Sequence, residues 1–168
     1  QATAAAFPDR PALTYQLTAG AYDPAQTQSW AEFHAEVCRA ANLFRSLGIR
    51  QGDAVALILP NCLETAAALL GAMIAGIAAP INPMLEPEQI ASLLRETGAR
   101  LVVSLKAFPK TDIAAKTAEA VRHAPQVRAV LEIDLKHYLD APKRWLIPLL
   151  RPRAAGINRA EVLNYAHE

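Results

Sequence analysis

Two glycines, Gly48 and Gly52, stand close together in a loop that precedes a predicted strand. Backbone N–H groups in such loops can hold phosphates, but the spacing of these two fits neither GxGxxG nor GxxxxGK[ST]. Asp53 follows directly, and its carboxylate would repel a phosphate. Lys106 and Lys110 follow a later predicted strand without a glycine loop. These residues therefore favour a helix C-cap, a turn and a solvated surface over a phosphate site.

Side chains for acid–base or nucleophilic catalysis are present but scattered. The four histidines are His34, His123, His137 and His167, and the four serines are Ser29, Ser46, Ser92 and Ser104. None of them stands in a catalytic motif such as GxSxG. Cys62 has one mechanism for reactivity, because the first turn of a helix lowers the pKa of a thiol; a small buried side chain is the simpler interpretation. We therefore predict no catalytic residue in this chain, and no metal ligand.

Strand and helix patterns alternate along the chain and would position these side chains. Short apolar runs predict strands at 54–59, 78–81, 101–105 and 127–133. Apolar residues at three- and four-residue spacing predict helices at 30–47, 62–76, 88–97 and 112–123. A small hairpin is expected within 12–29. The fold class is therefore α/β, with a mostly parallel sheet flanked by helices.

Two capping boxes mark helix starts. Ser29 with Glu32, and Asn61 with Glu64, have the Ser/Asn-x-x-Glu spacing in which two side chains close the first turn of a helix. The helix 62–76 is apolar nearly all round, which predicts a central and buried position.

The composition is that of one globular domain with little net charge. The 168 residues have a formal net charge of +1, and acidic and basic residues are interleaved, which argues against a nucleic-acid partner. The most apolar run, 66–81, is too short to span a bilayer, and Cys38 and Cys62 form no disulfide framework. We therefore expect a soluble, cytoplasmic protein with no transmembrane segment. Gln1 as first residue and the helix-like stretch 159–168 indicate that both ends are cut.

The character of the chain changes after residue 135. Residues 136–168 are rich in Lys and Arg, with Trp145, Ile147 and Leu150 between the charges. We therefore predict an α/β subdomain over 1–135 and a basic, amphipathic connecting segment over 136–168, which forms a helical C-terminal appendix.

The stretch from Gly48 to Val103 carries a series of short motifs in a fixed order. They are Leu-Gly-Ile, Gly-Asp, Leu-Pro-Asn, Pro-Ile-Asn-Pro and Leu-Glu-Pro-Glu, with Pro-Asp-Arg-Pro-Ala-Leu upstream. This series resembles the N-terminal region of adenylate-forming, AMP-binding enzymes: acyl-CoA synthetases, aryl-CoA ligases, luciferases and peptide-synthetase adenylation domains. The resemblance covers about residues 7–134.

The resemblance implies an enzyme that condenses a carboxylic acid with ATP to an acyl-adenylate and then transfers the acyl group to coenzyme A, with Mg2+ as the expected metal. In the family, the phosphate loop, the ribose aspartate and the catalytic lysine come later in the chain. We therefore expect the parent enzyme to be an acid–thiol ligase, and this fragment to be inactive and to bind none of these cofactors.

The resemblance also implies two candidate residues near coenzyme A. In relatives, a turn equivalent to Asn82-Pro83 is often followed by a basic residue that helps to hold a coenzyme A phosphate. Here Met84 occupies that position, so Asn82 and Met84 are the candidates for binding coenzyme A.

Two further expectations concern partners. The alternative to a synthetase fragment is a non-catalytic scaffold module that binds a partner or a membrane surface through its basic tail. If the chain is a fragment, apolar side chains that relatives cover with later residues would be exposed, and the fragment is expected to self-associate.

Overall fold

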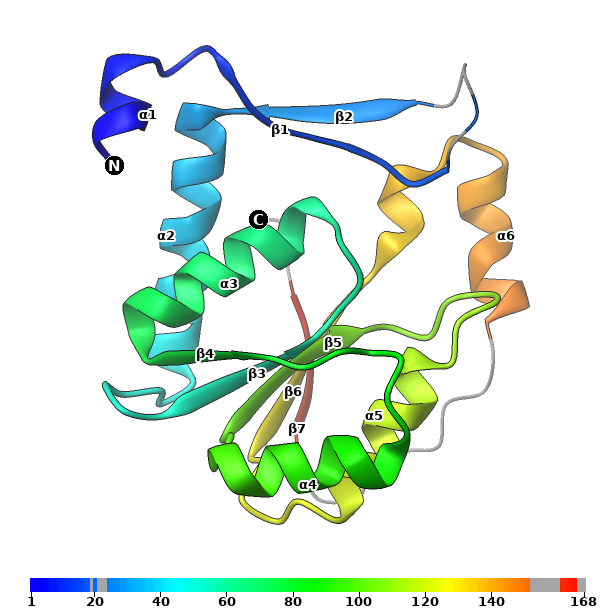
Figure 1. Cartoon of the computed structure of the whole chain (residues 1–168). Helices are drawn as coiled ribbons and strands as arrows, with labels where there is room; N and C mark the ends of the chain where they lie inside the picture. The colour runs from blue at the N-terminus through cyan, green and yellow to red at the C-terminus, as the bar shows by residue number, and fades with distance from the viewer. Residues whose placement is uncertain (19, 21–23, 152–160, 166–168) are drawn as a thin grey trace.

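The computed structural model describes residues 1–18, 20, 24–151 and 161–165. Helices and strands alternate through most of this range (Figure 1). In chain order they are α1 (Ala2–Ala6), β1 (Pro11–Gln16), β2 (Ala25–Ser29), α2 (Trp30–Ser46), β3 (Ala54–Ile58), α3 (Leu63–Ala75), β4 (Ile77–Pro80), α4 (Pro87–Thr97), β5 (Leu101–Leu105), α5 (Ile113–Arg122), β6 (Ala129–Ile133), the 3-10 helix η1 (Leu135–Tyr138), α6 (Lys143–Leu150) and β7 (Glu161–Asn164).

A five-stranded parallel sheet forms the core, in the order β4-β3-β5-β6-β7. The central strands β3 and β5 are buried over their whole length, because their side chains are almost all apolar and both faces of the sheet are covered. β4 lies at one edge, where Pro80 is tolerated although it has no N–H to donate. The predicted parallel α/β sheet is confirmed.

Helices cover both faces of this sheet. α3 connects β3 to its neighbour β4, whereas α4 and α5 lead the chain in the opposite direction, to β5 and β6. Right-handed crossovers then place α3 on one face and α4 with α5 on the other, as Figure 1 shows. The connections that leave β3 and β5 therefore lead toward opposite edges of the sheet. Ligands commonly bind beside the carboxyl ends of the two strands where the order switches in this way.

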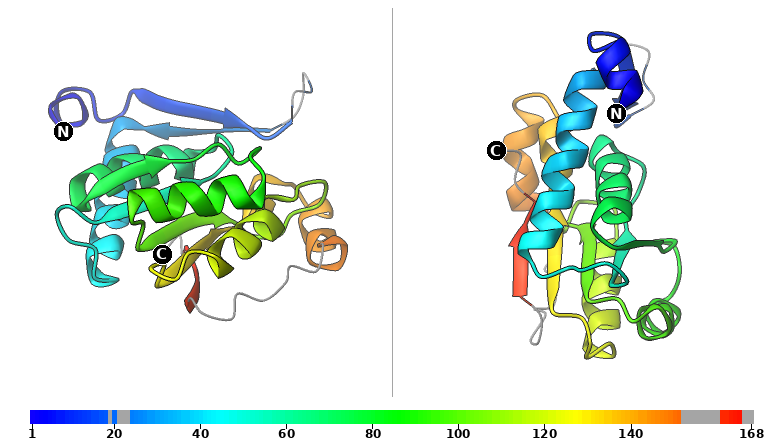
Figure 2. Two further views of the ribbon diagram at one scale, coloured as in Figure 1. Left: turned by 60° about the horizontal axis from the view of Figure 1, so that its bottom comes forward. Right: turned by 90° about the vertical axis from the view of Figure 1, so that its left-hand side faces the viewer.

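The hairpin β1–β2 lies outside the main sheet and packs against α2 and α3 (Figure 2). Its strands are antiparallel, and the hydroxyl oxygens of Thr14 and Thr27 are 2.9 Å apart across the pair. The predicted capping box then starts α2: Ser29 Oγ accepts from the Glu32 amide at 3.3 Å, and Glu32 Oε2 accepts from the Ser29 amide at 2.7 Å. The hairpin and the first long helix are confirmed.

The second predicted capping box, Asn61 with Glu64, is wrong. α3 begins at Leu63, its N-cap residue is Cys62, and that side chain makes no capping hydrogen bond. Glu64 instead turns into the protein and is 4% exposed. A local motif cannot anticipate this, because the partners of Glu64 come from residues more than seventy positions later in the chain.

The helix α3 is buried on one side only. Ala67, Ala68 and Ala72 face the core, whereas Met73 and Ile74 are 62% and 51% exposed. The expectation of a central and buried helix therefore holds for one side only: α3 is covered by α2 and the sheet, and the described residues leave its far side open.

Two parts of the chain from residue 135 onward, η1 and the residue after β7, pack into the core. Leu135, Tyr138 and Tyr165 are all buried with the main apolar cluster. Residues 161–164, which the sequence suggests are helical, form β7 instead, because they pair in parallel with β6. Residues 159–160 and 166–168 lie outside the described ranges. No helix in those ranges has the length and apolar character needed to cross a membrane. The domain boundary between residues 135 and 136 stays a prediction.

A close helix contact holds α2 against α3. At Gly71 an added Cβ atom would lie 2.7 Å from Ala40 Cβ and 3.0 Å from the Ala41 nitrogen. Carbon atoms do not approach each other so closely, so only glycine fits at this crossing. The contact depends on small residues in both helices.

We predict that Gly71→Ala destabilises the fold by about 1–3 kcal/mol, because the two helices must separate. At a solvent-exposed helix position, Gly→Ala raises the free energy of unfolding by about 1 kcal/mol. A decrease at Gly71 would therefore indicate the close contact. Urea unfolding measures it, with the exposed Met73→Ala as a control on the same helix. Adding Ala40→Gly to Gly71→Ala should restore part of the loss. A stabilising effect of Gly71→Ala would contradict the close contact.

Candidate functional site

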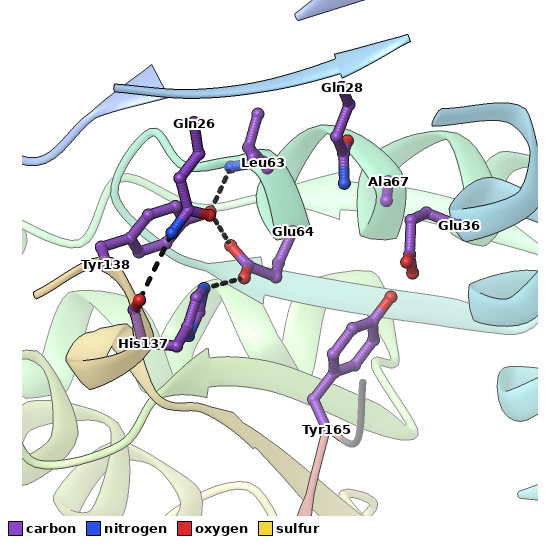
Figure 3. Close-up of a pocket in the computed structure, with 9 residues that line it drawn as sticks. All are labelled: Gln26, Gln28, Glu36, Leu63, Glu64, Ala67, His137, Tyr138 and Tyr165. Atoms are coloured by element: carbon purple, nitrogen blue, oxygen red, sulfur yellow. Dashed lines mark hydrogen bonds and ion pairs between the residues drawn. The ribbon is translucent and has the colours of Figure 1, made fainter. Parts of the chain in front are cut away.

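A buried polar cluster lies beyond the carboxyl ends of β3 and β6 (Figure 3). Glu64, in the first turn of α3, accepts a hydrogen bond from the Tyr138 hydroxyl at 2.7 Å through Oε2. Its other oxygen, Oε1, lies 2.8 Å from His137 Nε2. His137 and Tyr138 belong to η1, directly after β6. The parallel sheet therefore brings an acid, an imidazole and a phenol together from distant parts of the chain.

Tyr138 closes the amino end of α3. The Leu63 amide donates to the Tyr138 hydroxyl oxygen at 3.2 Å, so this side chain satisfies one of the N–H groups that the first turn of a helix leaves unpaired. Burial, and then the negative charge of Glu64, raises the pKa of Tyr138, which therefore stays a phenol. The same hydroxyl thus accepts from the helix and donates to the carboxylate.

His137 connects Glu64 to the backbone of η1. Its Nδ1 lies 2.6 Å from the carbonyl oxygen of Asp134, and its Nε2 faces Glu64. The imidazole therefore lies between a backbone carbonyl oxygen at the start of η1 and a carboxylate oxygen of α3.

Asp134 fixes the start of η1. Its side chain accepts from the Lys136 amide at 3.1 Å and pairs with Arg151. Burial of Asp134 acts to raise its pKa, but the hydrogen bonds from Arg151 and from the Lys136 amide outweigh burial and hold the pKa below its usual value. The carboxylate thus ties the residues that follow α6 to the end of β6.

The cluster borders a small polar cavity of about 110 Å³. Its walls come from β2, α2, α3, η1 and the end of β7: Gln26, Gln28, Glu36, Leu63, Glu64, Ala67, His137, Tyr138 and Tyr165. The Gln28 side-chain oxygen is buried, and no hydrogen-bond partner for it is found in the part of the chain that the structure describes. Ligand pockets usually measure about 300–1,000 Å³, so this cavity fits water molecules and not a nucleotide.

The Cys62 thiol is an unreactive group. The side chain is 7% exposed, and burial, followed by the charge of Glu64, raises its pKa to about 12. The thiol therefore stays protonated near neutral pH, and a thiolate is what a nucleophile requires. This supports the interpretation of Cys62 as a small buried side chain over the reactive alternative.

The two candidates for coenzyme A lie in a turn after the edge strand β4. Asn82 Oδ1 accepts from the Met84 amide at 2.9 Å, and the Asn82 carbonyl accepts from the Leu85 amide at 3.2 Å. The Met84 side chain is 74% exposed, and neither residue lines the polar cavity. The role of Asn82 and Met84 toward coenzyme A stays a prediction.

The other residues considered in the sequence have structural positions. Gly48 and Gly52 both adopt left-handed backbone conformations, at a helix end and in a turn, and Asp53 forms an ion pair with Arg100. Across the described residues, no three His, Cys, Asp or Glu side chains gather in a way that could hold a metal ion.

A larger hollow, of about 480 Å³, lies on the surface between α1, α2 and α3. Trp30, Phe33, Val37, Leu70 and Met73 give it mostly apolar walls. It has the volume for a ligand but lacks the cationic side chains that would bind phosphates. None of the three features that the structure describes here, the polar cavity, the Asn82 turn and this hollow, therefore suits ATP.

The sequence missed Glu64, His137 and Tyr138 as a group. One signal was available: Glu64 is a single acidic residue inside an otherwise apolar helix, and a buried carboxylate needs partners. The identity of those partners could not be predicted from the sequence, because η1 comes to lie beside α3 only when the sheet forms.

Comparison with known proteins extends this description. The family model described as AMP-binding enzyme matches residues 1–149. A 4-coumarate–CoA ligase from Pinus taeda is 37% identical over 140 residues, which cover 83% of this chain and 22% of that protein. A marinolic acid–CoA ligase from Pseudoalteromonas sp. (strain SANK 73390) is 38% identical over 112 residues, covering 67% of this chain and 17% of that protein.

The longest of these matches is to a long-chain-fatty-acid–CoA ligase from Bacillus subtilis, 27% identical, which covers 96% of this chain and 27% of that protein. Among solved structures, an anthranilate CoA ligase in complex with anthranoyl-AMP matches with a TM-score of 0.58 and 19% identity, over 85% of this chain and 27% of that one. This structural likeness supports the fold. The chain spans about a quarter or less of the length of the relatives named here.

We predict that Tyr138→Phe lowers the free energy of unfolding by about 1–3 kcal/mol, because it removes the hydrogen bonds of the Tyr138 hydroxyl to the buried Leu63 amide and to Glu64. Urea unfolding measures this. Tyr15→Phe is the matched control. The ring centroids of Tyr15 and Tyr138 are 4.7 Å apart, and no hydrogen bond of the Tyr15 hydroxyl is found among the described residues.

A second variant tests the pairing itself. Because Tyr138 and Glu64 share one hydrogen bond, the combined change Tyr138→Phe with Glu64→Gln should cost less than the sum of the two single changes. Strict additivity, or an unchanged unfolding midpoint in Tyr138→Phe, would contradict the assigned network.

Proposed function

We propose that this chain, which belongs to the family of AMP-binding enzymes, is the N-terminal part of an ATP-dependent acyl-CoA synthetase. The longer protein condenses a carboxylic acid with ATP, forming an acyl-adenylate and releasing pyrophosphate. The thiol of coenzyme A then attacks the acyl carbon, which gives a thioester and releases AMP. The protein is thus an acid–thiol ligase, with Mg2+ as the expected metal.

The continuous family match over residues 1–149 carries this proposal. Relatives at 37% and 38% identity are named as CoA ligases, one acting on 4-coumarate and one on marinolic acid. They differ in substrate, so the proposal extends to a carboxylic acid and coenzyme A but not to a particular acid. A cytoplasmic location belongs to the same proposal.

Within that protein we assign this part a scaffolding role. The polar cavity of about 110 Å³ is too small for ATP, and no group of metal-ligating side chains is found among the described residues. No chemical step is therefore assigned to them. Asn82 and Met84 are proposed to lie beside coenzyme A, at the turn after β4.

An exposed apolar surface supports a further part of the proposal. Leu70, Met73 and Ile74 of α3, together with Ile77 of β4, are 38–62% exposed; we call these four residues the α3 patch. The patch borders the apolar hollow between α1, α2 and α3. In the longer protein, later residues would cover it. When the 168-residue chain is made alone, a second copy covers it.

The first test concerns catalysis. The product of the complete reading frame should exchange pyrophosphate with ATP in the presence of at least one acid from a panel of short, long and aromatic carboxylic acids, and should form its CoA thioester. The 168-residue chain alone should give no exchange, because in the family the groups that stabilise the transferring phosphate come later in the chain. Exchange by the chain alone, or none by the longer protein with any acid, would overturn the proposal.

The second test concerns self-association. Light scattering over a wide range of concentrations should show the 168-residue chain passing from monomer to dimer, and the pair Met73→Ser with Ile74→Ser should shift this transition to higher concentration. Such exposed changes should leave the fold stable to within about 0.5 kcal/mol. A chain that stays monomeric throughout, or a transition that the pair leaves unchanged, would exclude the α3 patch as the contact.

A further inference from the structure

The short helix α6 presents an unusual surface. Of its eight residues, only Ile147 is buried. Trp145, Leu146, Leu149 and Leu150 are 70%, 49%, 81% and 62% exposed. Large apolar side chains gathered on one exposed element indicate an interaction site rather than chance exposure.

These four side chains share one face of the helix. Trp145 and Leu149 are four residues apart, as are Leu146 and Leu150, and residues at this spacing stand one above the other. Ile147 is the one buried residue of α6, and the helix packs against η1. Figure 1 shows α6 at the side of the molecule, away from α2 and α3. The α6 surface is therefore separate from the α3 patch.

Positive charge borders this apolar face. Lys143 and Arg144 are both exposed at the start of α6, and neither takes part in an ion pair within the described residues. α6 itself carries no acidic residue. Asp140, in the preceding turn, is the exposed acid closest to the helix in the chain, whereas Asp134 is already paired with Arg151 and Lys136. Two cationic side chains thus remain available beside the apolar face.

The size of the surface restricts its partner. An eight-residue helix is only about 12 Å long and exposes a correspondingly small area. A stable protein–protein interface needs roughly 800 Å² from each partner. Four side chains on one short helix are a small part of such an interface. They suffice, however, for shallow insertion into a lipid surface, where Trp and Leu enter the boundary region and Lys and Arg attract anionic headgroups.

We propose that α6 docks the protein on the surface of an anionic membrane. Trp145, Leu146, Leu149 and Leu150 insert at the level of the headgroups, while Lys143 and Arg144 contact the negative charge of the lipids. The helix lies on the membrane and does not cross it. Docking of this kind is weak and reversible, and high salt reverses its electrostatic part.

The test uses the product of the complete reading frame and phosphatidylcholine vesicles made with and without phosphatidylglycerol. The protein should co-sediment with the anionic vesicles more than with the neutral ones, and less at high salt. Changing Lys143→Ser and Arg144→Ser should weaken binding by about fivefold for each basic residue removed. The pair Trp145→Ser with Leu149→Ser should weaken it by about tenfold or more.

The pair Met73→Ser with Ile74→Ser is the matched control, since it removes two apolar side chains from the α3 patch, which lies apart from α6, and should leave vesicle binding unchanged. Circular dichroism would verify that all variants are folded. No preference of the unmodified protein for anionic vesicles, or equal binding by the Trp145 and Leu149 variant, would overturn the proposal. So would loss of self-association without lipid when the 168-residue chain carries the same two changes, because α6 would then be a protein contact.

Discussion

A carboxylate buried in an apolar helix requires hydrogen-bonding partners, and the packing of η1 against α3 depends on this requirement. Glu64 is 4% exposed at the start of α3, and breaking a buried pair typically costs roughly 3–5 kcal/mol. Its partners, His137 and Tyr138, lie on η1. The requirement therefore fixes η1 against α3, and with it the end of β6. Because the Tyr138 hydroxyl also accepts from the Leu63 amide, one side chain both pairs the carboxylate and closes the helix.

Local signals predicted most of the fold. The Ser29–Glu32 capping box, the apolar strands β3 and β5, and the stop of α4 at Gly98, whose φ is 64°, are all set by neighbouring residues. The candidate site depends on contacts between distant segments, and these contacts could not be predicted from the sequence. Glu64 has the spacing of a capping residue, but burial and its partners on η1 outweigh that motif. β7 likewise exists through pairing with β6, which no local pattern reveals.

The described residues divide into a closed interior and two open apolar surfaces. The interior polar cluster is small, fully engaged and suited to holding elements together. The α3 patch and the exposed face of α6 lie apart, and α6 combines its apolar side chains with two exposed cationic residues at its start. The chain belongs to the AMP-binding family, and its relatives are several times longer. The scaffolding role that we propose for this part rests on that difference in length.

Amide hydrogen exchange at Leu63 tests most directly whether Tyr138 closes α3. Amides in the first turn of a helix usually exchange fast, because they lack an intrahelical acceptor. Ala114, in the first turn of α5, is the reference, since Asp112 makes no side-chain capping hydrogen bond there. The account predicts that the Leu63 amide exchanges far more slowly than that of Ala114, and that Tyr138→Phe removes this protection. Exchange at Leu63 as fast as at Ala114 would contradict it.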